Sequence, residues 1–163
     1  MQKIKVFING FGRIGRSALR VMLDDDVFDV VGINDIFSFS QFQYVLQYDS
    51  LYKELPYKVT LHDDLLSVGE HRIKLFCQED PSKLALSSLD VDVLLQCSGR
   101  FLTLQDNMPY IDQGAKKVIL STPPNDDMPT YIMGFNHHDY QDEKIISNSS
   151  CSTNAIAPIM RVI

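Results

Sequence analysis

A glycine-rich turn near the N-terminus constrains the fold more than any other feature of this sequence. The spacing Gly10-x-Gly12-x-x-Gly15 follows a short apolar run at residues 4–8 and precedes apolar residues at helical spacing from 14 to 23. Between a strand and a helix, the first glycine permits a tight turn, the second lets a pyrophosphate approach the backbone, and the third lets the helix pack closely. The pattern predicts a dinucleotide-binding unit, although a tight turn that holds no ligand has the same spacing.

An acidic residue follows the turn at the distance that such a unit requires. A second apolar run at residues 30–33 completes a βαβ unit of roughly 30 residues, whose crossover we expect to be right-handed. Asp35 stands at its end, 20 residues after Gly15, where a carboxylate accepts hydrogen bonds from an adenosine ribose. It would repel a 2′-phosphate and no arginine follows in NDIFSFSQ, so NAD is favoured over NADP. The alternative is that Asp35 is only a strand-end turn residue.

The rest of the chain alternates between strands and helices, apart from an antiparallel excursion around Gly69. This order predicts an α/β fold: a Rossmann-type, doubly wound, mostly parallel sheet with helices on both faces. Pro109 is expected to interrupt a helix at residues 102–114. The remaining expected elements are helices at 38–48 and 102–114, and strands at 57–62, 65–76, 91–99, 116–121, 130–135 and 144–147.

Composition limits the class of protein and its partners. The 163 residues, 45% of them hydrophobic, suffice for one domain that buries roughly 70% of its unfolded surface. A formal charge of −6 without any Lys/Arg run argues against binding nucleic acid or an anionic membrane. We expect no signal peptide and no membrane span. Three scattered cysteines make neither a disulfide framework nor a zinc site, so a reducing cytoplasm is expected.

Cys151 lies in a polar segment, whereas Cys77 and Cys97 lie on apolar runs and are expected to be small buried hydrophobes. A thiol is nucleophilic as the thiolate, which a helix N-terminus or a positive neighbour favours. The serines around Cys151 are good N-cap residues, so a helix can begin there. Proline prefers the first helical position, so a helix beginning at Pro158 would instead leave the cysteine in a loop. Both alternatives remain open at this point.

Taken together, the motifs of this chain resemble the N-terminal half of phosphorylating glyceraldehyde-3-phosphate dehydrogenases. The matching segments follow the order and spacing of that family from residue 1 to residue 163; they are INGFGRIGR, IND, QYDS, GAKKVILSTPPNDDMPTYIMGFNHHDY and KIISNSSCSTNAIAP. The resemblance implies an NAD-binding domain at 1–150 and the truncated start of a catalytic domain at 151–163. It also implies a cytoplasmic homotetramer for the complete enzyme.

The resemblance also implies the reaction and its residues. Cys151 would form a hemithioacetal with glyceraldehyde 3-phosphate, and hydride transfer to NAD followed by attack of inorganic phosphate would yield 1,3-bisphosphoglycerate. By motif match, the residues around the cofactor's phosphates are Asn9, Gly10, Phe11, Gly12, Arg13, Ile14 and Gly15; Asp35 takes the ribose; Asn34 lies near the adenine; Ser98, Gly99 and Ser121 lie near the nicotinamide half; Ser150 and Ser152 hold the attacking phosphate.

The sequence departs from the family pattern at several positions. The family usually has threonine where Ser98 and Ser152 stand, and many members have a second cysteine at the position of Ala155. A basic residue is frequent at the position of Glu79, and a proline at the position of Ile36. The last two changes bear on the adenine side of the cofactor site.

The family's general base is a histidine some tens of residues beyond the cysteine, and this chain does not contain it. We therefore expect weak NAD binding and little or no turnover. The pair His137-His138 is expected to be a solvated turn rather than a metal site, because adjacent side chains point apart. Two alternatives to glyceraldehyde-3-phosphate oxidation remain: the same chemistry on erythrose 4-phosphate, and a non-catalytic dinucleotide-binding module.

Overall fold

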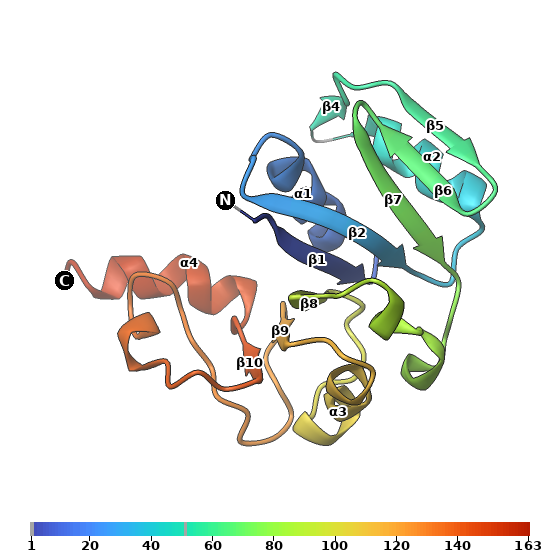
Figure 1. The fold of residues 1–163 in the computed structure, drawn as a ribbon. Coiled ribbons are helices and arrows are strands. Elements are labelled where there is room, and N and C mark those ends of the chain that lie inside the picture. Colours follow the sequence, from blue (N-terminus) through green and yellow to red (C-terminus); the bar gives the residue numbers. More distant parts are fainter. Residues whose placement is uncertain (1, 51) are drawn as a thin grey trace.

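A computed structural model describes residues 2–50 and 52–163 as alternating strands and helices (Figure 1). The strands are β1 (Ile4–Asn9), β2 (Phe28–Asn34), β3 (Tyr48–Asp49), β4 (Lys53–Glu54), β5 (Val59–His62), β6 (Leu65–Val68), β7 (His71–Phe76), β8 (Val93–Gln96), β9 (Lys117–Leu120) and β10 (Ile145–Ser147). The α-helices are α1 (Arg13–Leu23), α2 (Phe39–Gln47), α3 (Leu104–Asp112) and α4 (Cys151–Met160), and the short 3-10 helices are η1 (Pro81–Lys83), η2 (Leu86–Ser88) and η3 (His137–Asp139).

Within these residues the main sheet has eight strands in the order β10-β9-β8-β1-β2-β7-β6-β5. Every neighbouring pair from β10 to β7 is parallel. β6 and β5 extend the sheet antiparallel, and β3 and β4 form a small separate pair. The chain runs outward from β1 in both directions, so the switch point of the topology lies between β1 and β8. The expected doubly wound sheet with an antiparallel excursion is confirmed.

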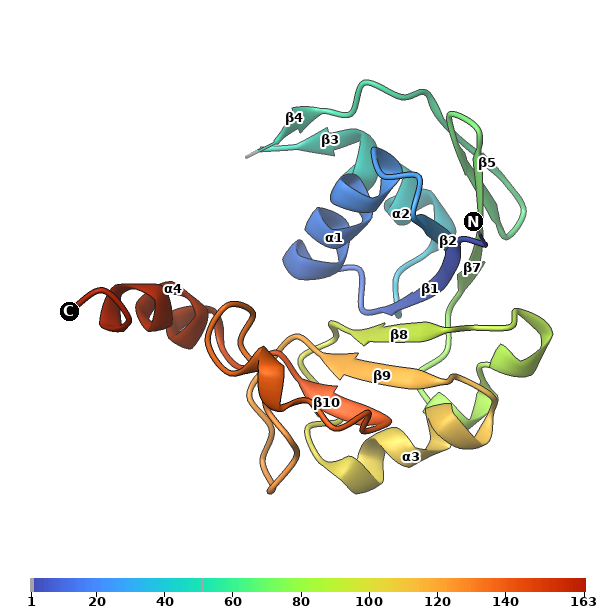
Figure 2. The same ribbon diagram turned by 60° about the vertical axis from the view of Figure 1, so that its left-hand side comes forward.

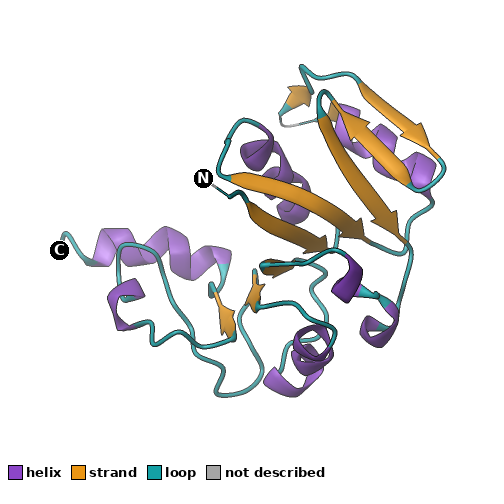
Figure 3. Cartoon of the chain, in the orientation of Figure 1, coloured by secondary structure: helices purple, strands orange, loops and turns teal. Residues whose placement is uncertain are grey.

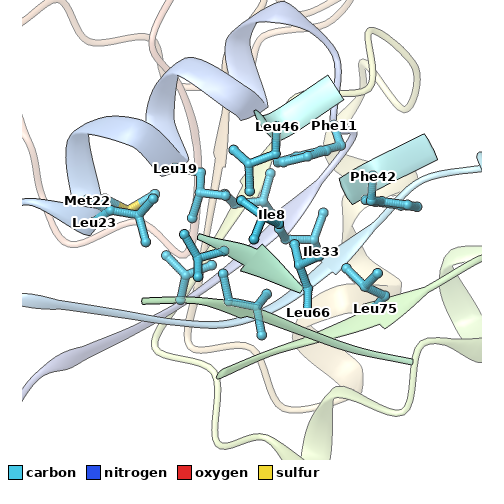
Figure 4. Close-up of a cluster of buried hydrophobic side chains, with 14 of the residues drawn as sticks. Ile8, Phe11, Leu19, Met22, Leu23, Ile33, Phe42, Leu46, Leu66 and Leu75 are labelled. Atoms are coloured by element: carbon cyan, nitrogen blue, oxygen red, sulfur yellow. The ribbon is translucent and has the colours of Figure 1, made fainter. Parts of the chain in front are cut away.

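Helices lie on both faces of the sheet (Figure 2). On one face, α1 and α2 bury their apolar sides against β1, β2 and the strands beyond them. Figure 4 shows this core, to which Leu19 and Leu23 of α1 and Ile8 and Ile33 of the strands belong. On the other face, α3 and η2 pack against β8 and β9, and η1 contacts α3. The two cores anchor the strand ends from which the candidate site is built.

One part of the sheet is left open on the α1 side. Alternate residues of β8, β9 and β10 are half-buried there, and together with Ile14 and Ala18 of α1 they line a largely apolar cavity of about 620 Å³. Its other lining residues belong to the segments that follow β9 and β10, among them Tyr131, His137 and Asn148. Helix α4 contributes no lining residue to this cavity, and it exposes further apolar side chains, among them Ile156, Ile159 and Met160. None of the helices in residues 2–50 and 52–163 is long and apolar enough to cross a bilayer.

The expected strand at residues 130–135 is wrong. The segment makes a single bridge, from Thr130 to Ser147, and then turns, as the loop between β9 and β10 in Figure 3 shows. The side chain of Asn136 takes the backbone groups that a ladder would use: its Oδ1 accepts from the Ile132 N–H at 2.7 Å, and its Nδ2 donates to the Thr130 carbonyl at 3.0 Å. Gly134 then adopts a positive φ of 81°.

The expected interruption of a helix at Pro109 is also wrong, because α3 runs through it from Leu104 to Asp112. A capping box between Thr103 and Asp106 fixes the start of the helix. Asn107 and Tyr110 are fully buried on either side of the proline. The buried contacts of the helix therefore outweigh the hydrogen bond that proline removes.

Candidate functional site

The three glycines of the turn between β1 and α1 occupy different surroundings. Gly10 has a φ of 97°, and a Cβ there would lie 2.3 Å from the Ser98 backbone nitrogen. At Gly15 a Cβ would lie 2.1 Å from the Gly10 carbonyl oxygen, so helix and turn are in close contact. At Gly12 a Cβ would meet nothing within 4 Å. The turn thus leaves open space at the N-terminus of α1, where a pyrophosphate fits against free N–H groups.

Asp35 ties the end of β2 to this turn. Its Oδ2 accepts from the Phe11 N–H at 2.5 Å, and its Oδ1 accepts from the Ile36 N–H at 2.7 Å. The side chain is half-buried and lines a cavity of about 260 Å³ together with Gly10 and Gly12. A ribose placed in this cavity would meet the remaining lone pairs of the carboxylate.

One arginine, distant in sequence, borders the same cavity. Arg100 Nη1 lies 2.9 Å from Glu79 Oε1, and its guanidinium stacks on the Phe101 ring at 5.4 Å. Because Glu79 pairs with this cation, a 2′-phosphate would have to compete with a carboxylate for Arg100. Arg100 therefore does not remove the preference for NAD over NADP that Asp35 indicates.

Neutral polar side chains are buried beneath the turn. Asn34 Nδ2 donates to Asn9 Oδ1 at 2.7 Å and to the Gln78 carbonyl at 2.9 Å, and Asn34 Oδ1 accepts from the Gln78 N–H at 2.8 Å. Asn9 Nδ2 donates to Gln96 Oε1 at 3.1 Å and to Tyr110 Oη at 2.8 Å. The amides of Asn9 and Asn34 are thus directed to protein partners, and they support the cofactor cavity from below.

The other residues matched to the cofactor lie at different depths. The Phe11 side chain is fully buried and stacks on Phe42 at 5.5 Å, so it packs in the core and does not line the cavity. Arg13 is exposed, and Ile14 faces the apolar cavity over β8 to β10 instead. Ser121 follows β9, and its N–H donates to the Gln96 carbonyl at 3.0 Å.

Ser98 and Gly99 form the turn after β8. The Ser98 N–H and Oγ both donate to Gln96 Oε1, at 3.2 and 2.8 Å. Gly99 has a φ of 72° and open space around its Cβ direction. This turn contacts the glycine turn at Gly10, so the two backbones form adjoining walls of the cavity.

Cys151 is the first residue of α4, which resolves the choice left open by Pro158. Ser150 is the N-cap, and its Oγ accepts from the Thr153 N–H at 3.0 Å. Asn154 Nδ2 donates to the Asn148 carbonyl at 2.7 Å, which fixes the approach to the helix. Cys151 and Ser152 are exposed. A thiol in such a first turn is placed as a nucleophile needs to be.

The structure corrects two further expectations. Cys77 is exposed just after β7, because the strand ends at Phe76, so it is not a buried hydrophobe. Cys97 is half-buried, and burial raises the pKa of its thiol.

The rings of His137 and His138 lie 3.8 Å apart on η3, where the tight helical turn brings them together, so they do not point apart. Among the described residues, no cluster of three or more ligand side chains is suited to a metal.

The residues that sequence reasoning missed are Gln78, Gln96, Arg100 and Tyr110. Gln96 is the one polar residue in the run VLLQ of β8, which is a weak signal for a buried polar partner. Tyr110 reaches the site from α3 and carries no motif. Only the folded chain brings these residues to the glycine turn.

All these segments meet at one edge of the sheet. The turns after β1, β2 and β8 enclose the cofactor cavity at the switch point. The loops after β9 and β10 are joined there by the Asn148 N–H, which donates to the Leu120 carbonyl at 2.8 Å, and they lead to Cys151. A glycine turn of this geometry at the carboxyl ends of parallel strands defines a Rossmann-type dinucleotide-binding domain.

Comparison with known proteins gives the particular family. Residues 4–104 match the family described as "Glyceraldehyde 3-phosphate dehydrogenase, NAD binding domain". The chain belongs to this family, and its cofactor is NAD.

Curated relatives agree over nearly the whole chain. A glyceraldehyde-3-phosphate dehydrogenase of Bacteroides fragilis (strain YCH46) is 41% identical over 162 residues, which cover 98% of this chain and 49% of the relative. One from Chlamydia muridarum (strain MoPn / Nigg) is 39% identical over 163 residues, 98% of this chain and 49% of the relative. The cytosolic enzyme of Trypanosoma brucei brucei is 38% identical over 160 residues, 98% and 48%. The chain spans about half the length of the curated relatives it matches.

Proposed function

We propose that this chain is the NAD-binding part of a phosphorylating glyceraldehyde-3-phosphate dehydrogenase. Residues 1–150 are the NAD-binding domain, and 151–163 are the start of the catalytic domain. One observation carries the proposal: the glycine turn with Asp35 and the helix that begins at Cys151 are built on the same edge of one parallel sheet. A cofactor and a nucleophile can therefore serve one substrate.

In the proposed reaction, Cys151 Sγ attacks the aldehyde carbon of glyceraldehyde 3-phosphate and forms a hemithioacetal. NAD, when bound, supplies the hydride acceptor. Loss of the hydride and of the hydroxyl proton leaves a thioester on Cys151. An oxygen of inorganic phosphate then attacks the thioester carbon, the thiolate leaves, and 1,3-bisphosphoglycerate is released. A base for the proton transfers belongs to the part of the relatives that lies beyond this match.

The residues of this chain prepare these steps. Gly12 leaves room for the pyrophosphate at the start of α1, and Asp35 accepts from the ribose hydroxyls. Ser98, which lines the cofactor cavity, Gly99, and Ser121, which lines the apolar cavity over β8 to β10, would lie near the nicotinamide half. Ser150 and Ser152 flank the nucleophile, and their hydroxyls would help to hold the attacking phosphate; Ser150 Oγ also caps α4.

The remainder of such an enzyme would complete both the site and the surface. The open apolar cavity over β8 to β10 and the exposed apolar side of α4 are surfaces that a further domain would cover. We accordingly propose that the 163-residue chain turns over poorly, and that the complete enzyme is a cytoplasmic homotetramer.

Kinetics of the longer protein test the proposal. Phosphate-dependent NADH formation from glyceraldehyde 3-phosphate is expected, measured at 340 nm, and Cys151→Ser should abolish it. The assignment would be overturned if the Cys151→Ser variant turned over as fast as the unchanged longer protein. It would also be overturned if the 163-residue chain turned over as fast as the longer protein. Cys77→Ser is the matched control, because Cys77 is also exposed. It follows β7, which lies on the other side of β2 from β10, the strand that precedes α4.

A further inference from the structure

A tyrosine hydroxyl lies at the centre of the buried polar side chains under the cofactor turn. Tyr110 Oη accepts from Asn9 Nδ2 at 2.8 Å and from Gln96 Nε2 at 2.9 Å. Asn9 Nδ2 also donates to Gln96 Oε1, so the three side chains form a closed triangle. Their exposed fractions are 3% for Asn9, 1% for Gln96 and 0% for Tyr110.

We propose that Tyr110 is a positioning residue for NAD: its hydroxyl orients the amides of Asn9 and Gln96, and thereby fixes the two backbone turns that wall the cofactor cavity. The identity of the ligand rests on the proposed function. The network itself does not.

The two amides lie directly before the two turns. Asn9 is the last residue of β1 and precedes Gly10, and Gln96 is the last residue of β8. The turn after β8 is held by Gln96, whose Oε1 accepts hydrogen bonds from both the N–H and the Oγ of Ser98. Turning the Gln96 amide would therefore release Ser98.

The two turns also contact each other, so they move together. The position of a Cβ on Gly10 would be 2.3 Å from the Ser98 nitrogen and 2.4 Å from its Cα, which leaves no slack between the backbones. A displacement of the turn after β8 of even a few tenths of an ångström must be passed to the glycine turn. The single atom Tyr110 Oη is therefore hydrogen-bonded to the residues that precede both turns.

The hydroxyl is held in place by helix α3. Tyr110 lies on α3, whose start is fixed by its capping box, and its ring packs edge-on against Phe101 with centroids 6.4 Å apart. Burial raises the pKa of the phenol, so it remains neutral throughout the physiological range. Every member of the triangle is uncharged, and its geometry should not depend on pH between 5 and about 9.

Removing only the hydroxyl tests the proposal on the 163-residue chain. Tyr110→Phe keeps the ring but leaves the buried Gln96 Nε2 without this acceptor. The Kd for NAD, measured by calorimetry well below the melting temperature, should rise about tenfold. The control is Tyr57→Phe, which removes the 2.5 Å hydrogen bond to Asp24, outside the cofactor cavity. It should leave the Kd unchanged even where it lowers the Tm.

Amide hydrogen exchange gives a readout that needs no ligand. The Gly10 N–H bonds to the Asn34 carbonyl and the Ser98 N–H to Gln96 Oε1. Both should exchange at least several-fold faster in Tyr110→Phe and at the wild-type rate in Tyr57→Phe. A merely structural role would instead raise exchange across α3 and the sheet and leave the NAD Kd of the folded protein unchanged.

A double-mutant cycle closes the test. Gln96→Met removes the whole amide with little change of volume, and with it the hydrogen bonds to Tyr110, Asn9 and Ser98, so it should weaken NAD binding at least as much as Tyr110→Phe. Tyr110→Phe combined with Gln96→Met should weaken NAD binding by less than the sum of the two single losses, because Tyr110 acts on Ser98 through the Gln96 amide that the second change already removes. Additive losses, or an unchanged Kd in either single variant, overturn the inference. Should the wild-type chain not bind NAD at all, the proposed function fails, and the exchange of the two amides still decides whether Tyr110 holds the turns.

Discussion

The carboxylate of Asp35 accepts a hydrogen bond from the backbone N–H of Phe11 at 2.5 Å, so the acid at the end of β2 is attached to the glycine turn after β1. The two signals of a dinucleotide site are thereby one structural unit. A ribose that binds Asp35 also meets the turn that holds the pyrophosphate.

Asp35→Asn should weaken NAD binding about tenfold, because hydrogen bonds from ribose hydroxyls to a carboxylate are stronger than those to an amide. The same change should narrow the gap between NAD and NADP, since the repulsion of a 2′-phosphate is lost. Calorimetric titration with both nucleotides checks this. Asp26→Asn changes the same charge at an exposed position outside the cavity and should alter neither Kd; an effect equal to that of Asp35→Asn would point to net charge rather than to a ribose contact.

Alanine at two glycines of the turn should separate stability from binding. Gly10→Ala requires a Cβ at a φ of 97° and against the Ser98 backbone, so it should lower the free energy of unfolding by about 3 kcal/mol. Gly12→Ala places its Cβ in open space at an ordinary φ of −73°. It should change the free energy of unfolding by less than ~1 kcal/mol and yet weaken NAD binding, because the methyl group occupies room for the pyrophosphate. Urea unfolding and calorimetry measure both quantities; unaltered NAD binding by Gly12→Ala would place the pyrophosphate elsewhere.

The three cysteines should react with iodoacetamide in a definite order. Cys77 and Cys151 are exposed, whereas Cys97 is half-buried and burial raises the pKa of its thiol, so less of it is thiolate at pH 8. Mass spectrometry of the native chain should find Cys97 modified last, and modified readily only at higher pH or in urea. NAD should slow the labelling of Cys151 more than that of Cys77. Early labelling of Cys97 would mean that its strand end opens.

Stability should fall in acid partly through Asp92. A hydrogen bond from Lys116 and another from the Lys5 backbone N–H hold the pKa of the Asp92 carboxyl below its ordinary value. Its contribution is therefore fully present above the pKa of the unfolded chain, near 4, and is lost as pH falls through the lower pKa of the folded state. Asp92→Asn should cost about 1 kcal/mol at pH 7 and much less at pH 2. Urea midpoints at the two pH values measure this, and an equal loss at both would exclude the ionised carboxylate as the cause.

The first βαβ unit could be predicted from sequence because its local signals agree. The apolar runs, the glycine spacing and the position of Asp35 all require the same turn. The same reasoning failed where tertiary contacts outweigh local preference. Helix α3 continues past Pro109 because Asn107 and Tyr110 are buried on either side of it. At 130–135 the side chain of Asn136 hydrogen-bonds the backbone, and the segment forms a turn instead of the expected strand.

The candidate site divides in the same way. Residues that must be of a given type to meet a ligand, such as Gly12 and Asp35, are visible as motifs. Residues that hold those motifs in place from below, such as Gln96 and Tyr110, lie far apart in sequence and are ordinary in composition. They become visible only as distances between atoms.

The most direct test of the account is to titrate NAD into the ¹⁵N-labelled 163-residue chain and follow the backbone amide resonances, since this detects even millimolar binding. We expect shifts confined to the carboxyl edge of the sheet: the glycine turn at residues 10–15, Asp35 and the turn at 98–100, with smaller changes at Cys151. No shifts at millimolar NAD, or shifts centred on the separate cavity between α2 and β5 that Tyr44 and Tyr57 line, would contradict it.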